Sequence, residues 1–285
     1  MVINELRQKA INRLKHAKIS DTVALDVLVL MKYVWNTDEI GLVMSGHDKA
    51  DDSKVNELLS LIERRCKGEP IAYLCGEKEF MNQLFYVEPG VLIPRADTEC
   101  VVEQALSLLS NNKPNILDIG TGSGCIAISL AKLLPDATVT ALDISDTALQ
   151  CAIDNAKKNN VTITFEKMNI LTEEPDGKYD LIISNPPYIR SEVVQKLDAT
   201  VKNYEPHSAL DGGDDGLVFY KRLIPLASQH LNPGGILVFE IGFDQGEQVC
   251  QLIQSDKSFA LPQMIYDLAG RDRGVYTTKE KEVKE

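Results

Sequence analysis

The tetrapeptide Asn185-Pro186-Pro187-Tyr188 directly follows an apolar run, Tyr179–Ser184, that predicts a buried strand. Two consecutive prolines fix φ and force the residues before them into extended conformations. The Asn185 side chain and the Pro186 carbonyl are therefore held rigidly, and both can accept hydrogen bonds from an NH₂ group. Two such acceptors would aim the lone pair of an amide or exocyclic amine nitrogen at an electrophile, while Tyr188 can stack on the flat group. The segment predicts a site for a planar NH₂ donor.

No strong base is needed before the attack if the electrophile is a sulfonium methyl group. The nitrogen becomes cationic and acidic once it is methylated, and it can lose its proton afterwards. Catalysis then consists mainly of orientation for in-line displacement and of electrostatic support. The alternative interpretation of the tetrapeptide is an ordinary turn, since Asn-Pro and Pro-Pro are common in loops.

A second segment, Asp118–Gly124, has the spacing G-x-G-x-G between a strand-like run and a helical run. Glycine lets the backbone turn sharply and approach a ligand closely, and a helix N-terminus offers free N–H groups. Asp143, at the end of the next strand, can accept hydrogen bonds from both hydroxyls of a ribose. The pair predicts a nucleoside ligand, and Asp118 can hold a cationic group of that ligand or cap the helix. A tight structural turn is the alternative for the glycines.

The elements that must position these segments alternate between strand and helix after residue 113. Strands are predicted at 115–119, 139–143, 162–165, 179–184, 236–240, 264–268 and 274–278, and helices at 123–134, 146–159 and 216–231. This alternation predicts an α/β fold with a doubly wound, mostly parallel seven-stranded sheet, Rossmann-like in its layers. If the fourth strand lies beside the first, the glycine loop and the tetrapeptide face each other over one cleft.

Apolar residues at helical spacing predict a small helical bundle over residues 1–78, with helices at 3–17, at 23–34 and from Ser53. Runs at Phe80–Val87 and Val91–Ile93, separated by Glu88-Pro89-Gly90, predict a β-hairpin that links two domains over residues 79–95. The second domain is then 96–285, with a solvated tail over 279–285.

Composition excludes several classes of protein. Forty-two acidic and 30 basic residues give a net charge of −12, which disfavours stable binding of nucleic acid or of an anionic membrane. The six cysteines lie far apart without a C-x-x-C pair, so we expect reduced, mostly buried thiols and no metal site. Charged residues at Glu5, Arg7 and Lys9 interrupt any signal-peptide core, which predicts a cytoplasmic protein, and we expect a monomer.

These segments resemble the class I S-adenosylmethionine-dependent methyltransferases, and within them the release-factor glutamine methyltransferases (the HemK/PrmC family). The most specific matches are Gly90–Glu99, Asp118–Gly124 and Asn185–Tyr188. Further matches lie at Gly68–Tyr73, Glu205-Pro206, Asp211–Gly216, Asn232–Gly235, Glu240–Gly242 and Asp267–Arg273.

The resemblance implies a cofactor, a substrate and their contacts. S-adenosyl-L-methionine would be bound by Gly120, Thr121, Gly122, Ser123, Gly124, Asp143, Asn169 and Asn185, and S-adenosyl-L-homocysteine would be the product. The substrate amide would be held by Asn185, Pro186, Pro187 and Tyr188, with Asn185, Pro186 and Tyr188 as the catalytic residues. The amide would be N5 of the glutamine in the Gly-Gly-Gln motif of peptide chain release factors, and the N-terminal helical domain would engage that protein.

The chain departs from the family pattern at two places. Ala96 stands where proline is usual, and Asn169-Ile170 stands where an acidic–aromatic pair often touches the adenine. Two of the matching segments also have a purely structural interpretation. Asp97 and Thr98 can cap a helix, and Asp211–Gly216 can be a plain surface loop.

Two other functions would suit parts of the sequence. An amino-methyltransferase acting on adenine or guanine in nucleic acid would also use Asn-Pro-Pro-Tyr, but it predicts a basic groove with aromatic residues. Here the basic residues are dispersed and Trp35, in the helical segment, is the only tryptophan. The second alternative function is that of an NAD enzyme or of a nucleotide-binding module without catalysis. Cys125 argues against it, because this residue stands where a dinucleotide fingerprint requires its third glycine.

Overall fold

The computed structural model of the chain describes residues 1–111 and 113–281. It divides into two compact units, Met1–Glu77 with Asp198–Tyr204, and Lys78–Leu197 with the chain from Glu205 on. The domain boundaries expected at residues 78 and 95 stay predictions.

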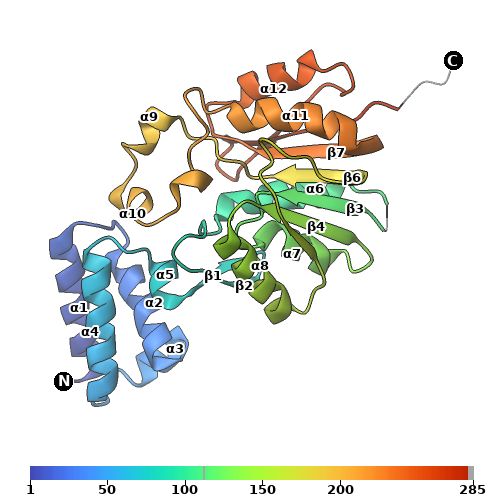
Figure 1. Cartoon of the computed structure of the whole chain (residues 1–285). Helices are drawn as coiled ribbons and strands as arrows, with labels where there is room; N and C mark the ends of the chain where they lie inside the picture. Colours follow the sequence, from blue (N-terminus) through green and yellow to red (C-terminus); the bar gives the residue numbers. More distant parts are fainter. Residues whose placement is uncertain (112, 282–285) are drawn as a thin grey trace. The chain divides into compact units, whose positions relative to one another are not determined.

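The first unit is helical, as its periodicity predicts (Figure 1). Its helices are α1 (Ile3–Ala17), α2 (Val23–Trp35), α3 (Glu39–Met44), α4 (Asp52–Cys66), α5 (Ile71–Cys75) and the short α10 (Ala199–Lys202). Buried side chains of α1, α2 and α4 form one apolar core, and a buried ion pair joins Asp26 of α2 to Arg65 of α4 at 2.9 Å. Tyr204 donates a hydrogen bond to the Lys67 carbonyl oxygen, which fixes the second segment of this unit.

The second unit contains a seven-stranded sheet in the order β5-β4-β3-β6-β7-β9-β8. The strands are β3 (Asn115–Ile119), β4 (Thr138–Asp143), β5 (Thr164–Lys167), β6 (Tyr179–Ser184), β7 (Leu231–Glu240), β8 (Gln263–Tyr266) and β9 (Asp272–Thr278). Strands β3 to β7 are parallel, and β9 is antiparallel to both of its neighbours. The predicted mostly parallel sheet is confirmed. The third strand lies two residues later than predicted, because it pairs with Thr140–Asp143 of β4 from Thr164 onward.

Each face of the sheet carries its own apolar core, since successive side chains of a strand point to opposite faces. Leu117 and Ile182 pack with α11 (Val218–His230) and α12 (Gly246–Ser255), while Ile116 and Ile183 pack with α6 (Glu99–Leu108), α7 (Cys125–Leu133) and α8 (Asp146–Asn159). The sheet is therefore covered on both sides, as Figure 1 shows. The sequence patterns missed α6 and α12.

The hairpin position was wrong. Its strands are β1 (Glu77–Phe80) and β2 (Gln83–Tyr86), and the turn is Met81-Asn82, with φ of 49° and 56°. Two left-handed residues are what a tight hairpin turn requires, and Asn is common there whereas Met is rare. The Pro-Gly signal at 88–90 marks a separate turn after the hairpin.

Two expectations about the surface also need correction. All six cysteines are free, but only Cys151 is buried and the other five are half-buried. Residues 279 and 280 donate backbone hydrogen bonds to Gly235 and Ser258 and do not begin a free tail, while 282–285 lie outside the described residues. Within the described part, no helix could cross a membrane and no cluster of three or more His, Cys, Asp or Glu could hold a metal ion.

Candidate active site

A cavity of about 530 Å³ lies in the second unit, at the carboxyl ends of β3, β4 and β6. Residues 120–123 after β3, Asp143 at the end of β4 and 185–187 after β6 all line it. Since β3 and β6 are paired neighbours, the glycine loop and the tetrapeptide share one cavity. The predicted juxtaposition is confirmed.

The glycine loop after β3 is folded back onto the end of β4. The N–H groups of Gly120 and Thr121 both donate to the Leu142 carbonyl oxygen, at 2.8 and 2.9 Å. Gly120 and Gly122 have φ of 76° and 57°, which L residues rarely adopt, and a Cβ on either would meet no atom within 4 Å. Their open side leaves room for close approach of a ligand to the backbone.

Gly124 has a different role from the other two glycines. Its φ is 81°, and a Cβ there would lie 2.9 Å from Ile128 Cδ1 and 3.0 Å from Ala152 Cβ. It does not line the cavity and instead lets α7 begin close to α8. Gly124 thus shapes the loop from behind.

Asp143 connects the ends of β3 and β4. Its Oδ2 accepts from the Gly122 N–H and its Oδ1 accepts from the Ser145 N–H, both at 2.9 Å. Burial raises the pKa of Asp143, and these two donors oppose that effect. Each carboxylate oxygen can accept a further hydrogen bond, so Asp143 can hold the loop and still receive hydroxyl groups of a ligand.

Asp118 lies fully buried beneath the loop and is not part of the cavity wall. Thr121 donates to its Oδ2 at 2.6 Å, but Oδ1 makes no hydrogen bond of normal geometry. Burial raises the pKa of Asp118 to about 7, against the opposing effects of the Thr121 hydroxyl and the Ala127 N–H. A buried carboxyl that is incompletely satisfied is costly, and its negative charge favours a cationic group on the cavity side of Thr121.

The tetrapeptide begins where β6 leaves the sheet. Asn185 lines the cavity and its Nδ2 donates to the Thr98 hydroxyl at 3.4 Å; Pro186 and Pro187 also line the cavity. Tyr188 does not, because its hydroxyl lies 3.4 Å from Glu240 Oε1 and its ring packs against the core beneath α11. The structure therefore brings Asn185, Pro186 and Pro187 to the cavity and directs Tyr188 away from it.

The Asp211–Gly216 loop packs directly on the tetrapeptide. A Cβ on Gly212 would lie 2.8 Å from the Pro187 carbonyl oxygen, and a Cβ on Gly216 would lie 2.5 Å from the Tyr188 carbonyl oxygen. The Gly212 N–H also donates to the Ile189 carbonyl at 2.8 Å. Glycine is needed at both positions for this close approach, so the loop is a support for the tetrapeptide and not a plain surface loop.

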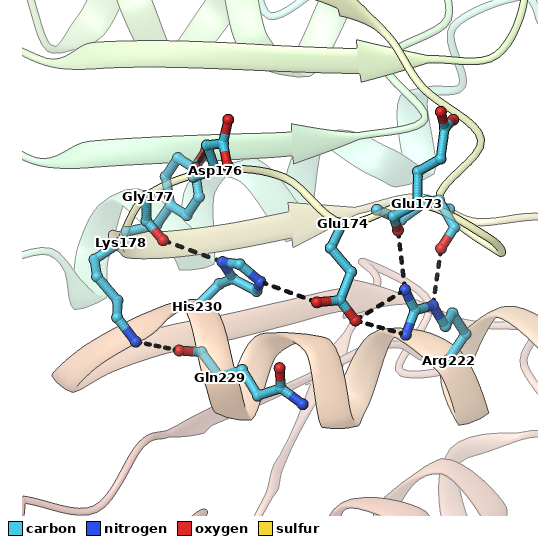
Figure 2. A network of polar contacts seen from close by, with 10 residues as sticks. Glu173, Glu174, Asp176, Gly177, Lys178, Arg222, Gln229 and His230 are labelled. Atoms are coloured by element: carbon cyan, nitrogen blue, oxygen red, sulfur yellow. Dashed lines mark hydrogen bonds and ion pairs between the residues drawn. The ribbon is translucent and has the colours of Figure 1, made fainter.

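Asn169 lines the cavity on the β5 side, in a short loop fixed from outside. Its Oδ1 accepts from the Leu171 N–H at 3.2 Å, which leaves its Nδ2 for a ligand. Figure 2 shows how Arg222 of α11 holds this loop. The Arg222 guanidinium donates to the carbonyl oxygens of Ile170 and Glu173, both at 2.9 Å, and to Glu174 Oε1 at 3.2 Å.

Sequence reasoning missed the contacts that fix the far wall of the cavity. Glu205, only 4% exposed, accepts from Arg95 Nη2 at 2.6 Å and from the Ile93 N–H at 3.2 Å. This holds residues 91–95 against the cavity. Both residues lie in segments that carry the family resemblance, but their separation by 110 positions gives no local signal of the pair.

The layers, strand order and loop positions define a class I methyltransferase fold. A solved methyltransferase from Pyrococcus furiosus has this fold too, with a TM-score of 0.54 and 18% identity, covering 81% of this chain and 100% of that one. Family models describe residues 5–76 as a PrmC N-terminal domain and residues 102–205 as a methyltransferase small domain.

Full-length relatives identify the family. The release factor glutamine methyltransferase of Koribacter versatilis is 37% identical over 278 residues, covering 96% of this chain and 98% of that protein. The enzyme of the same name from Geobacter sulfurreducens is 40% identical and covers 80% of each chain. The chain belongs to the release factor glutamine methyltransferase family.

Proposed function

We propose that this protein transfers a methyl group from S-adenosyl-L-methionine to N5 of the glutamine in the Gly-Gly-Gln motif of peptide chain release factors. The observation that carries the proposal is that one cavity is lined by both the glycine loop and Asn185–Pro187. The names of its relatives supply the substrate.

The residues around the glycine loop suit this cofactor. The open side of Gly120 and Gly122 admits a ligand against the backbone, Asp143 can accept from a ribose, and the negative charge of Asp118 favours a cationic amino group. We assign cofactor contacts to Gly120, Thr121, Gly122, Ser123, Asp143, Asn169 and Asn185, and a shaping role to Gly124. When bound, the cofactor supplies an electrophilic methyl group on a sulfonium, and S-adenosyl-L-homocysteine remains. The reaction requires no metal.

The tetrapeptide would hold the amide. Asn185 Oδ1 and the Pro186 carbonyl accept the two amide hydrogens, which draws the nitrogen lone pair out of conjugation and toward the methyl group. The rigid Pro186-Pro187 backbone keeps both acceptors in place. Orientation supplies most of the rate gain, and the methylated nitrogen then releases its proton. Tyr188 braces the segment through Glu240.

We further propose that the helical first unit recognises the release factor and that the enzyme acts as a cytoplasmic monomer. The net charge of −12 supports a protein substrate over naked nucleic acid.

The deciding experiment is incubation with purified release factor and labelled cofactor, followed by mass spectrometry of the Gly-Gly-Gln peptide. We expect one added methyl group on the glutamine side chain. A release factor with alanine in place of that glutamine is the control. Labelling of adenine or guanine in nucleic acid, with none on the peptide, would instead establish the base-modifying alternative.

Asp143→Ala should weaken cofactor binding by at least about tenfold, since hydrogen bonds to a charged group contribute about 1.5–3 kcal/mol each. The loss combines ligand contacts with the Gly122 and Ser145 contacts that shape the loop. Isothermal titration calorimetry measures the dissociation constant. Asp146→Ala is the matched control, because that carboxylate is exposed and pairs with Lys167. Equal affinities in the two variants would contradict the ribose assignment.

Arg222→Ala should also weaken cofactor binding, by roughly fivefold. The substitution removes the hydrogen bonds that order the loop around Asn169, and a fivefold loss corresponds to about one net hydrogen bond. The effect is indirect, through the carbonyl of Ile170 and through that of Glu173, which Figure 2 labels. Lys221→Ala on the same helix is the control, since Lys221 pairs only with Asp215 among its described contacts. An Arg222→Ala variant with unchanged affinity would show that the loop holds its shape without this clamp.

A further inference from the structure

A buried polar cluster lies behind the tetrapeptide, on the side away from the cofactor loop. Thr98, just before α6, is 2% exposed, and Glu240, at the end of β7, is 1% exposed. Tyr188 reaches this cluster through its hydroxyl. The reaction as described above assigns no task to Thr98, and its proposed capping role is not seen, since its side chain makes no cap hydrogen bond to α6.

Thr98 connects the cluster to the cavity. It lines the cavity wall, and its hydroxyl oxygen accepts from Asn185 Nδ2 at 3.4 Å. Glu240 Oε2 makes no hydrogen bond of normal geometry, and the Thr98 hydroxyl is a neighbour with which the Glu240 carboxyl interacts. Burial raises the pKa of Glu240 to about 7, and hydrogen bonding by the Thr98 hydroxyl opposes that effect.

When Glu240 is ionised, the donor and acceptor inventory of these three groups allows one consistent arrangement. A hydroxyl has one hydrogen and two lone pairs, whereas an ionised carboxylate can only accept. Glu240 therefore takes the Thr98 hydrogen, and a Thr98 lone pair remains for Asn185. Because only the Nδ2 of Asn185 can donate to that lone pair, its Oδ1 points away from Thr98.

We propose that Thr98 and Glu240 are positioning residues that fix the Asn185 amide with its oxygen toward the substrate nitrogen. The inference rests on the proposed function, because it gives Asn185 Oδ1 the substrate amide as its partner. A reversed Asn185 amide would set its own NH₂ against the NH₂ of the glutamine, where neither can accept. The hydroxyl of Thr98 thus selects the productive orientation.

Thr98→Val tests this directly, since valine keeps the shape and removes the hydroxyl. We expect kcat for release-factor methylation to fall about tenfold, an effect of the size of one hydrogen bond to a neutral partner. KM for the release factor and the dissociation constant of the cofactor should change less than about twofold. Thr98→Ser, which keeps the hydroxyl, should restore most of kcat.

A double variant separates positioning from a general packing effect. If Thr98 acts through Asn185, Thr98→Val should cause no further loss in an Asn185→Ala background. Multiplied losses, or wild-type kcat in Thr98→Val, would overturn the inference while leaving the proposed function intact. If Thr98→Val melts at a much lower temperature, Thr98→Ala takes its place: it also removes the hydroxyl, so the same fall in kcat is expected, and an unchanged kcat would overturn the inference. Absence of product with the wild-type enzyme would overturn the proposed function, and this role with it.

Discussion

Replacing Asn185 by alanine is expected to lower kcat about 100-fold or more, while the cofactor dissociation constant changes much less. Asn185 supplies one of the two acceptors that hold the amide hydrogens, and deletion of one precisely placed polar group typically costs a factor of this size. The Pro186 carbonyl remains, so the amide can still bind, but its nitrogen is no longer held in a fixed direction. Single-turnover rates and calorimetric titration measure the two quantities separately.

The matched control for this substitution is Asn232→Ala. Asn232 also donates a side-chain hydrogen bond, to Asp180 Oδ1 at 2.8 Å, but it lies at the start of β7, at the opposite end of the strand from Glu240. Any loss of activity through general destabilisation should appear in both variants. Near-normal turnover in Asn185→Ala would show that the glutamine amide is held by other groups.

The sheet was predictable because its signals are local. Strands β3, β4 and β6 are short apolar runs bounded by glycine, proline or a capping residue, and the alternation with helices determines that they are parallel. The order of strands then brought the glycine loop and Asn185 to one edge. These parts of the site depend only on where strands end, which the sequence patterns mark directly.

The parts that could not be predicted depend on contacts between distant residues. The direction of Tyr188 follows from the position of Glu240, 52 residues later, and nothing in Asn-Pro-Pro-Tyr itself distinguishes stacking in the cavity from anchoring behind it. Helix α6 was given no range, although helix capping was weighed for Asp97 and Thr98, because the stretch after them was not examined for helical spacing. The hairpin was misplaced because a turn with Met at a left-handed position contradicts local preference and is stabilised by its surroundings.

The pH dependence of stability is expected to change when Asp118 is replaced by asparagine. Burial raises the pKa of Asp118 to about 7 from an ordinary value of 3.8, so the folded protein holds this proton more tightly than the unfolded chain does. Its contribution to stability is full below about pH 4, is lost as pH rises toward 7, and does not change above that. Between pH 5 and pH 8 the loss is on the order of 3 kcal/mol.

Urea unfolding of wild type and Asp118→Asn at several pH values measures this difference. The free energy of unfolding of the wild type should fall relative to that of the variant as pH rises from 5 to 8, because asparagine does not ionise. Titrating groups that do not interact with Asp118 are common to both proteins and cancel in the subtraction. Asp143 does not cancel fully, because its charge raises the pKa of Asp118, and this coupling is part of the measured difference. Saturation with S-adenosyl-L-methionine should lessen the wild-type slope, since a cationic ligand favours the ionised carboxylate. Parallel curves for the two proteins would mean that Asp118 is ionised throughout this range. The glycine loop would then stabilise the buried carboxylate even without a ligand.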